Sequence, residues 1–210
     1  MKLIILGAPG AGKGTQAEIL SDRLNVPAIS TGAIIREEIK NKTPFGVEAK
    51  TYIDDGQLLP DDMVNKMLLN RIAEDDCKDG YILDGFPRTV SQAEFLDANG
   101  VDIDRALSLE VEDEVIIERL SGRRECISCR APYHIKNNPP KKEGICDRCG
   151  SPLKARDDDN PKTIAERLKV YHEKTAPVMD YYKSNGKLLK VESKSSIDAT
   201  ADAILQSLGV

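Results

Sequence analysis

The chain has 210 residues and a net charge of −5, with 40% hydrophobic and 31% charged residues, as in ordinary folded globular proteins. The acidic balance argues against a general nucleic-acid binder, which is usually basic. No apolar run approaches the ~18 residues of a membrane-spanning helix, and the N-terminal residues do not read as a cleavable signal peptide. We therefore expect a cytoplasmic protein whose five cysteines are metal ligands or buried thiols rather than disulfides.

Short apolar runs alternate with amphipathic stretches along the chain, and this alternation predicts an α/β fold with a parallel sheet. The expected strands are Lys2–Leu6, Pro27–Ser30, Tyr81–Asp84, Ala106–Glu110 and Lys187–Val191. The longest helix is expected to begin near Pro161 and to break at Pro177. A last helix is expected near the C-terminus with Asp198 as its N-cap.

A glycine-rich loop follows the first expected strand and precedes an amphipathic helix. It reads Gly7-Ala8-Pro9-Gly10-Ala11-Gly12-Lys13-Gly14-Thr15. Such a loop turns its backbone N–H groups toward phosphate oxygens, and Lys13 can reach the β- and γ-phosphates. The strict pattern has Ser or Thr directly after the Lys, whereas Gly14 intervenes before Thr15. The sequence therefore predicts a nucleotide phosphate site of a variant type.

Asp84 ends the expected strand Tyr81–Asp84 and is followed by Gly85-Phe86-Pro87-Arg88-Thr89. An acidic residue at this edge of an open α/β sheet lies where ligands bind. Alone, such an Asp is more often a turn residue, but beside a phosphate loop it is a candidate Mg²⁺ ligand acting through water.

The segment from about Gly122 to Asp159 lacks helical periodicity and is rich in cysteine, proline and basic residues. Between Arg119 and Arg156 there are six arginines and four lysines against three acidic residues. Two Cys-x-x-Cys pairs, Cys126/Cys129 and Cys146/Cys149, are separated by sixteen residues. This spacing is typical of a closed four-thiolate zinc site, which is structural. Another thiophilic metal or a redox pair is the alternative.

These motifs together resemble the adenylate kinase family, in its long-lid bacterial type. The resemblance rests on the glycine-rich loop, Ser30-Thr31-Gly32 with Arg36, Gly56-Gln57-Leu58-Leu59-Pro60-Asp61, Asp84-Gly85-Phe86-Pro87-Arg88 with Gln92, and Gly122-Arg123-Arg124. It runs in the same order from residue 1 to about residue 190. It implies a P-loop kinase with a five-stranded parallel sheet flanked by helices, an AMP-binding helical insertion and a zinc-binding lid.

The resemblance also implies domain boundaries and residue roles. The core would be residues 1–29, 60–121 and 160–210, the AMP-binding insertion 30–59 and the lid 122–159. Catalytic residues would be Lys13, Arg88, Arg123, Arg156 and Arg167. ATP would be bound by Gly10, Ala11, Gly12, Lys13, Gly14, Thr15, Arg119, Arg123, Pro132 and Tyr133. AMP would be bound by Thr31, Arg36, Gln57, Leu58, Leu59, Gly85, Phe86, Pro87, Arg88, Gln92, Arg156 and Arg167.

The implied reaction is the reversible, Mg²⁺-dependent conversion of ATP and AMP into two ADP by a monomer with one structural Zn²⁺, in which lid closure excludes water. Asp157-Asp158-Asp159 could form a metal site, but pairing with nearby arginines at the lid hinge is favoured. Cys77, His134 and His172 are expected to have no direct function.

Two departures from the family lie at Leu59, where Val is usual, and near Lys194, Ser195 and Ser196, where no role is assigned. Three alternatives remain: a kinase of another nucleoside monophosphate, a catalytically idle nucleotide-binding protein, and a zinc ribbon that binds nucleic acid.

Overall fold

The computed structural model describes residues 1–194 and 196–210. Within these ranges a five-stranded parallel sheet has the strand order β2-β3-β1-β4-β8. Its strands are β1 (Lys2–Leu6), β2 (Ala28–Ser30), β3 (Tyr81–Asp84), β4 (Arg105–Glu110) and β8 (Leu188–Glu192). The predicted parallel α/β sheet is thereby confirmed, and each strand lies within one residue of its expected bounds.

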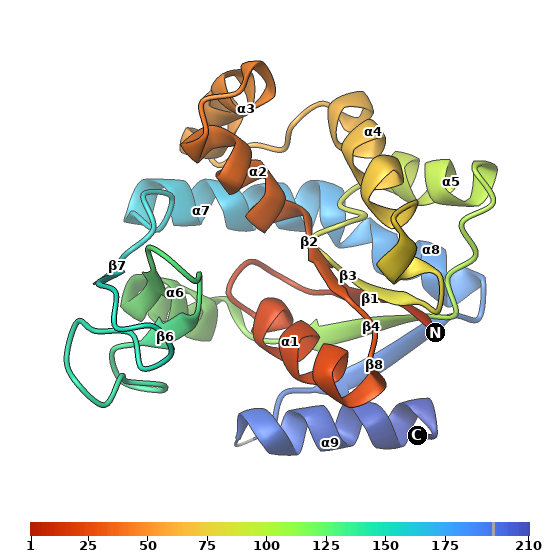
Figure 1. Cartoon of the computed structure of the whole chain (residues 1–210). Coiled ribbons are helices and arrows are strands. Elements are labelled where there is room, and N and C mark those ends of the chain that lie inside the picture. The colour runs from red at the N-terminus through yellow and green to blue at the C-terminus, as the bar shows by residue number, and fades with distance from the viewer. Residues whose placement is uncertain (195) are drawn as a thin grey trace.

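Helices cover both faces of the sheet (Figure 1). They are α1 (Lys13–Leu24), α2 (Thr31–Lys40), α3 (Pro44–Asp54), α4 (Asp61–Ile72), α5 (Val90–Ala98), α6 (Asp113–Gly122), α7 (Pro161–Val170), α8 (Pro177–Ser184) and α9 (Ile197–Leu208), with a short 3-10 turn η1 (Asp75–Cys77). Helices α1 and α9 pack on one face, and α4, α5 and α8 lie on the other. No helix in residues 1–194 and 196–210 combines the length and apolar character needed to cross a bilayer.

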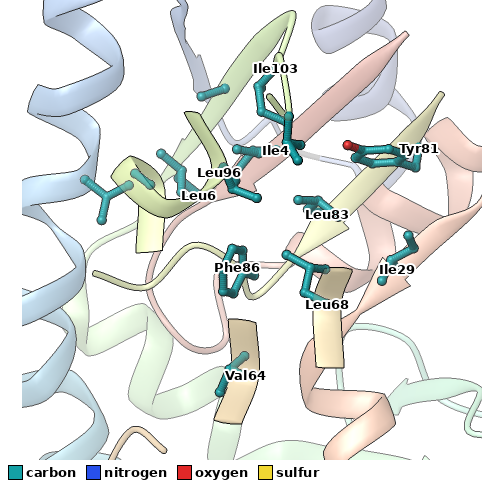
Figure 2. Close-up of a cluster of buried hydrophobic side chains, with 14 of the residues drawn as sticks. Ile4, Leu6, Ile29, Val64, Leu68, Tyr81, Leu83, Phe86, Leu96 and Ile103 are labelled. Carbon is teal, nitrogen blue, oxygen red and sulfur yellow. The ribbon is translucent and has the colours of Figure 1, made fainter. Parts of the chain in front are cut away.

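Two apolar clusters fill the space between the sheet and its helices. One includes Ile4, Leu83 and Phe86 and continues into α4 and α5, as Figure 2 shows. The other includes Leu3, Leu107 and Ile204 beneath α1 and α9. Because strand side chains alternate between the two faces, residues of the same strand serve both clusters.

Residues 30–59, which we call the helical insertion, form α2 and α3 beyond β2. Residues 122–159, which we call the cysteine segment, contain the antiparallel strands β5 (Arg123–Cys126), β6 (Pro132–His134) and β7 (Leu153–Lys154) in the order β6-β5-β7. Figure 1 shows the cysteine segment beyond the carboxyl ends of the sheet strands, joined to the core through α6 and α7.

The N-cap of α9 differs from the sequence expectation, whereas the break between α7 and α8 agrees with it. The N-cap of α9 is Ser196, whose side chain accepts a hydrogen bond from the amide of Ala199 at 3.1 Å, so the assignment of Asp198 was wrong. Asp198 lies inside the first turn, where a negative charge also suits the helix dipole. The expected break at Pro177 is confirmed, since a π-helical turn at Tyr171–Thr175 (η2) separates α7 from α8.

Candidate active site

The glycine-rich loop connects β1 to α1 and lines a large cavity of about 970 Å³. Gly10 and Gly12 have φ values of 86° and 97°, a left-handed conformation that residues with a Cβ rarely adopt. None of the described side chains caps the start of α1. The amides of its first turn are therefore available to an anion, which the helix dipole also attracts.

Lys13 begins α1, and its ammonium bends back over the loop. Its Nζ donates to the carbonyl oxygens of Gly7 and Ala8, both at 2.8 Å. Burial lowers the pKa of Lys13 to about 8; Asp84 opposes this shift, while nearby arginines add to it. The Lys13 ammonium therefore lies among more positive than negative side chains. An entering phosphate would supply the negative charge that this site lacks.

Asp84 lies at the carboxyl end of β3, beside the glycine-rich loop. Its Oδ2 accepts a hydrogen bond from the hydroxyl of Ser30 at 3.1 Å. Ser30 also caps α2 by accepting from the amide of Ala33. Sequence reasoning assigned no role to Ser30, although its position at the end of the neighbouring strand β2 places it against Asp84.

Arginines from distant parts of the chain converge on the large cavity. The lining includes Arg36, Arg88, Arg119, Arg123, Arg130, Arg156 and Arg167. Burial is the main reason why the pKa of Arg36 is lowered to about 10, and the pKa values of Arg88 and Arg167 are lowered for the same reason. Within the described residues, Nε of both Arg36 and Arg156 is buried without a hydrogen-bond partner. Such orphaned donors favour an anionic ligand.

Carboxylates of the cysteine segment pair with several of these arginines. Asp159 accepts two hydrogen bonds from Arg123, at 2.8 and 2.6 Å. Arg167 contacts Asp158 at 2.8 Å and Asp159 at 3.2 Å. These contacts confirm the expected pairing of Asp158 and Asp159 with arginines, while no such contact is recorded for Asp157 among the described residues.

Glu125 is a buried partner that sequence reasoning missed. It forms ion pairs with Arg156 and, at 3.0 Å, with Arg130. Burial alone would raise its pKa, but Arg156 and Arg36 outweigh burial and keep the pKa low. In the sequence Glu125 looks like an ordinary surface charge, so no local signal could have revealed it.

A narrower pocket of about 20 Å³ lies next to the large cavity, between α2, α4 and the loop after β3. It is lined by Thr31, Ile35, Ile53, Gln57, Leu58, Leu59, Val64, Gly85, Arg88 and Gln92. Thr31 Oγ1 and Arg88 Nε both donate to the carbonyl oxygen of Gly85 at 2.8 Å. The side-chain amide of Gln57 instead donates to Glu166 on α7 at 2.7 Å.

Two other expected site residues occupy unexpected surroundings. Phe86 is only 1% exposed and packs in the main core, as Figure 2 shows, while Pro87 lines the large cavity. Tyr133 lines the cavity with Pro132, yet its hydroxyl is used within the cysteine segment, where it accepts from the amide of Asp147 at 2.7 Å.

His134 also lines the large cavity, although it was expected to have no direct function. Its Nδ1 accepts from the amides of Lys136 and Asn137, both at 3.0 Å, and its ring abuts Gly122 so closely that a Cβ there would lie 2.3 Å from Nε2. Lys194 and Ser196 line the cavity as well, whereas Ser195 lies outside the described residues.

The four cysteines Cys126, Cys129, Cys146 and Cys149 come together within the cysteine segment. Their Sγ atoms all lie within 4.8 Å of one another, and the nearest pairs are 3.4–3.5 Å apart. Thiolates at the usual Zn–S distance of about 2.3 Å around a tetrahedral ion would be separated by about 3.8 Å, so the cluster fits zinc. A closed four-cysteine set leaves no coordination position for substrate.

Comparisons with known proteins agree with this geometry. The chain matches the protein family described as adenylate kinase over residues 5–187. It is 53% identical over 214 residues to the adenylate kinase of Caldicellulosiruptor saccharolyticus, with 100% of both chains covered. It is also 53% identical over 213 residues to that of Lachnospira eligens, again covering 100% of both. For Clostridium perfringens strain SM101 the identity is 50% over 213 residues, covering 100% of this chain and 99% of the relative.

Proposed function

The chain belongs to the adenylate kinase family, and we propose that the groups around the two cavities perform the family reaction. That reaction transfers the terminal phosphoryl group of ATP to AMP and yields two ADP. The observation that carries the assignment of roles is the convergence of loop amides, Lys13 and buried arginines on one cavity. Phosphoryl transfer needs mainly alignment and charge neutralisation, which these groups supply.

We assign the ATP phosphates to the glycine-rich loop and Lys13. The acceptor AMP is assigned to the narrower pocket, with its phosphate directed toward Arg36 and Arg88. Both guanidiniums can contact phosphate in a bidentate way. Because about 20 Å³ is too small for a purine, the pocket has to widen when AMP enters. Movement of the helical insertion against the sheet is the simplest way to widen it.

Arg123, Arg156 and Arg167 are assigned to the transferring phosphoryl group. In the structure their charges are balanced by Glu125, Asp158 and Asp159. Nucleotide phosphates would take over this balance, so these carboxylates act as temporary partners of the arginines. The exchange favours closure of the cysteine segment over bound nucleotides, which also excludes water from the reaction.

Two metal ions are part of the proposal. Asp84, through water, and Thr15 would hold Mg²⁺, which neutralises charge on the phosphates. The four cysteines would hold one structural Zn²⁺. Free thiols suited to a metal also fit the reducing cytoplasm. Since every assigned group comes from one chain, we propose that it acts as a monomer.

Substitutions of the phosphate-binding cations test this assignment. We expect Lys13→Ala and Arg88→Ala to lower the rate of ADP formation from ATP and AMP by about 10²–10³-fold without unfolding the protein. The exposed residues Lys66 and Arg105 provide matched controls, and Lys66→Ala and Arg105→Ala should retain the parent rate. Near-normal rates in Lys13→Ala and Arg88→Ala would contradict the proposed roles. A comparison of AMP with CMP, UMP and GMP as acceptors tests the choice of base.

A further inference from the structure

Gln92 has its side-chain amide fixed from both sides inside the narrower pocket. It begins the buried side of α5 and is only 2% exposed. Its Nε2 donates to Asp61 Oδ1 at 2.7 Å, and its Oε1 accepts from the backbone amide of Arg88 at 2.7 Å. A side-chain amide has two donor and two acceptor positions, so one of each remains free for a ligand.

Asp61 is itself held in place. It is the first residue of α4, and its second carboxylate oxygen accepts from the hydroxyl of Thr89 at 2.9 Å. Thr89 caps α5 by accepting from the amide of Gln92 at 3.1 Å. Asp61 lines neither cavity, whereas Gln92 lines the narrower one, so Asp61 would act on a base through Gln92.

The orientation of the Gln92 amide decides which base it can match. On its Watson–Crick edge adenine presents the N6 amino donor beside the N1 acceptor. Hypoxanthine presents the reverse pattern, with the O6 acceptor beside the N1–H donor. A freely rotating glutamine amide could match either edge by exchanging its oxygen and nitrogen. An ionised carboxylate only accepts and a backbone N–H only donates, so Asp61 and Arg88 together permit one orientation.

We propose that Asp61 is a positioning residue that makes the AMP site specific for a 6-amino purine, by holding the Gln92 amide in the orientation that matches adenine and opposes hypoxanthine. This inference rests on the proposed assignment of AMP to the narrower pocket. A site built around fixed hydrogen-bonding groups rejects a mismatched base because its buried donors and acceptors are left unpaired.

The test measures kcat and KM with AMP and with inosine monophosphate, which carries hypoxanthine. Asp61→Asn replaces an acceptor with an amide that offers either an oxygen or an NH2 group. We expect the ratio of kcat/KM for AMP to that for inosine monophosphate to fall about tenfold, mainly through KM for AMP. Asp62→Asn removes the adjacent, exposed charge of the same helix turn and should leave the ratio unchanged. In Asp61→Asn the backbone amide of Arg88 still binds the side-chain oxygen of Gln92. The preference for AMP over inosine monophosphate should therefore weaken without reversing.

A double-mutant cycle shows whether Asp61 acts through Gln92. In a Gln92→Ala background, Asp61→Asn should not change the ratio of the kcat/KM values for AMP and inosine monophosphate any further. Asp61→Asn with the parent ratio, or with equal losses for both nucleotides, would overturn the proposal. If the unaltered protein converts ATP and AMP into ADP in the same experiment, such a failure leaves the proposed function intact. No ADP from the unaltered protein would contradict the proposed function instead.

A measurement on the unaltered protein covers the case in which Asp61→Asn does not fold. In ¹⁵N-labelled protein the side-chain NH2 of Gln92, identified by its loss in Gln92→Ala, should exchange with solvent much more slowly than that of the exposed Gln206. Exchange as fast as that of Gln206 would show that the amide is not fixed.

Discussion

The cysteine segment and the helical insertion both supply arginines to the same cavity, but they are stabilised in different ways. The insertion extends the main core, because Ile35, Ala49 and Leu59 belong to the cluster beneath the sheet. The cysteine segment has a separate cluster of only Cys126, Ala131, Tyr133 and Cys146 among its buried residues. A cluster this small cannot stabilise a subdomain alone. We infer that a metal ion stabilises the cysteine segment, whereas packing against the main core stabilises the helical insertion.

Metal removal should give the largest effect and separate the two regions most clearly. Structural zinc contributes about 10–16 kcal/mol of apparent binding free energy in small domains. Chelation, or Cys129→Ala, should therefore abolish hydrogen-exchange protection in β5, β6 and β7 while α2 and α3 keep theirs. Because Arg123 and Arg156 lie in the cysteine segment, activity should be lost together with this protection.

Cys77→Ala is the matched control, since Cys77 is a buried cysteine outside the four-cysteine cluster. It should leave exchange in the cysteine segment unchanged. Equal loss of protection in the helical insertion after chelation would remove the distinction between the regions. Loss of catalysis with the cysteine segment still folded would give the metal more than a structural role.

A core substitution in the helical insertion should have the next largest effect. Ile35→Ala removes a buried side chain from the main core and should lower the global free energy of unfolding by about 2–5 kcal/mol. Leu153→Ala, in the small cluster of the cysteine segment, should increase exchange locally and leave global unfolding nearly unchanged. Denaturant unfolding followed by circular dichroism checks both variants. A global effect of Leu153→Ala would show that the two cores are coupled.

How far the sequence predicted these features depends on the range of the interactions involved. The sheet strands, the glycine-rich loop and the four cysteines are local patterns, and they agree with the structure. The α9 N-cap was misplaced because Ser196 and Asp198 are both good capping residues and only the backbone decides between them. Glu125 and the contact between Asp61 and Gln92 depend on tertiary neighbours, so no spacing rule could indicate them.

Proton uptake should distinguish the ATP side of the cavity from the AMP side. Because burial lowers the pKa of Lys13 to about 8, much of it is neutral at pH 9, and nearby phosphates should raise that pKa again. ATP binding between pH 8 and the ordinary lysine value should therefore take up a large fraction of a proton, and the uptake should fall toward zero as the pH drops one to two units below 8. AMP binding should take up less, since Arg36, with a pKa of about 10, stays mostly charged at pH 9.

Calorimetry at pH 9 in two buffers with different ionisation enthalpies measures this uptake. Lys13→Met should remove it from ATP binding. Equal uptake for both nucleotides, or uptake that persists in Lys13→Met, would mean that another group titrates and that the two sides do not differ in this way.

The smallest expected effects belong to the ion pairs that join the cysteine segment to the rest of the molecule. Arg148 contacts Glu18 on α1 at 3.2 Å, and Arg130 contacts Glu37 on α2 at 3.4 Å. All four side chains are more than one-third exposed, and such surface pairs contribute about 0.2–1 kcal/mol each. The first pair joins the cysteine segment to the core, whereas the second joins it to the helical insertion.

We expect Arg148→Gln to raise turnover by about two- to fivefold at low ionic strength, because a weaker contact lets the cysteine segment lift and release product sooner. The gain should vanish in about 1 M salt, where the screening length is about 3 Å. Lys190→Gln breaks an equally exposed pair with Glu110 within the sheet and should leave turnover unchanged.

Arg130→Gln shows which regions move together. If it raises turnover as Arg148→Gln does, the cysteine segment opens as one body against both neighbours. If only Arg148→Gln raises turnover, the cysteine segment moves together with the helical insertion. Unchanged turnover in both variants would mean that neither contact restrains opening.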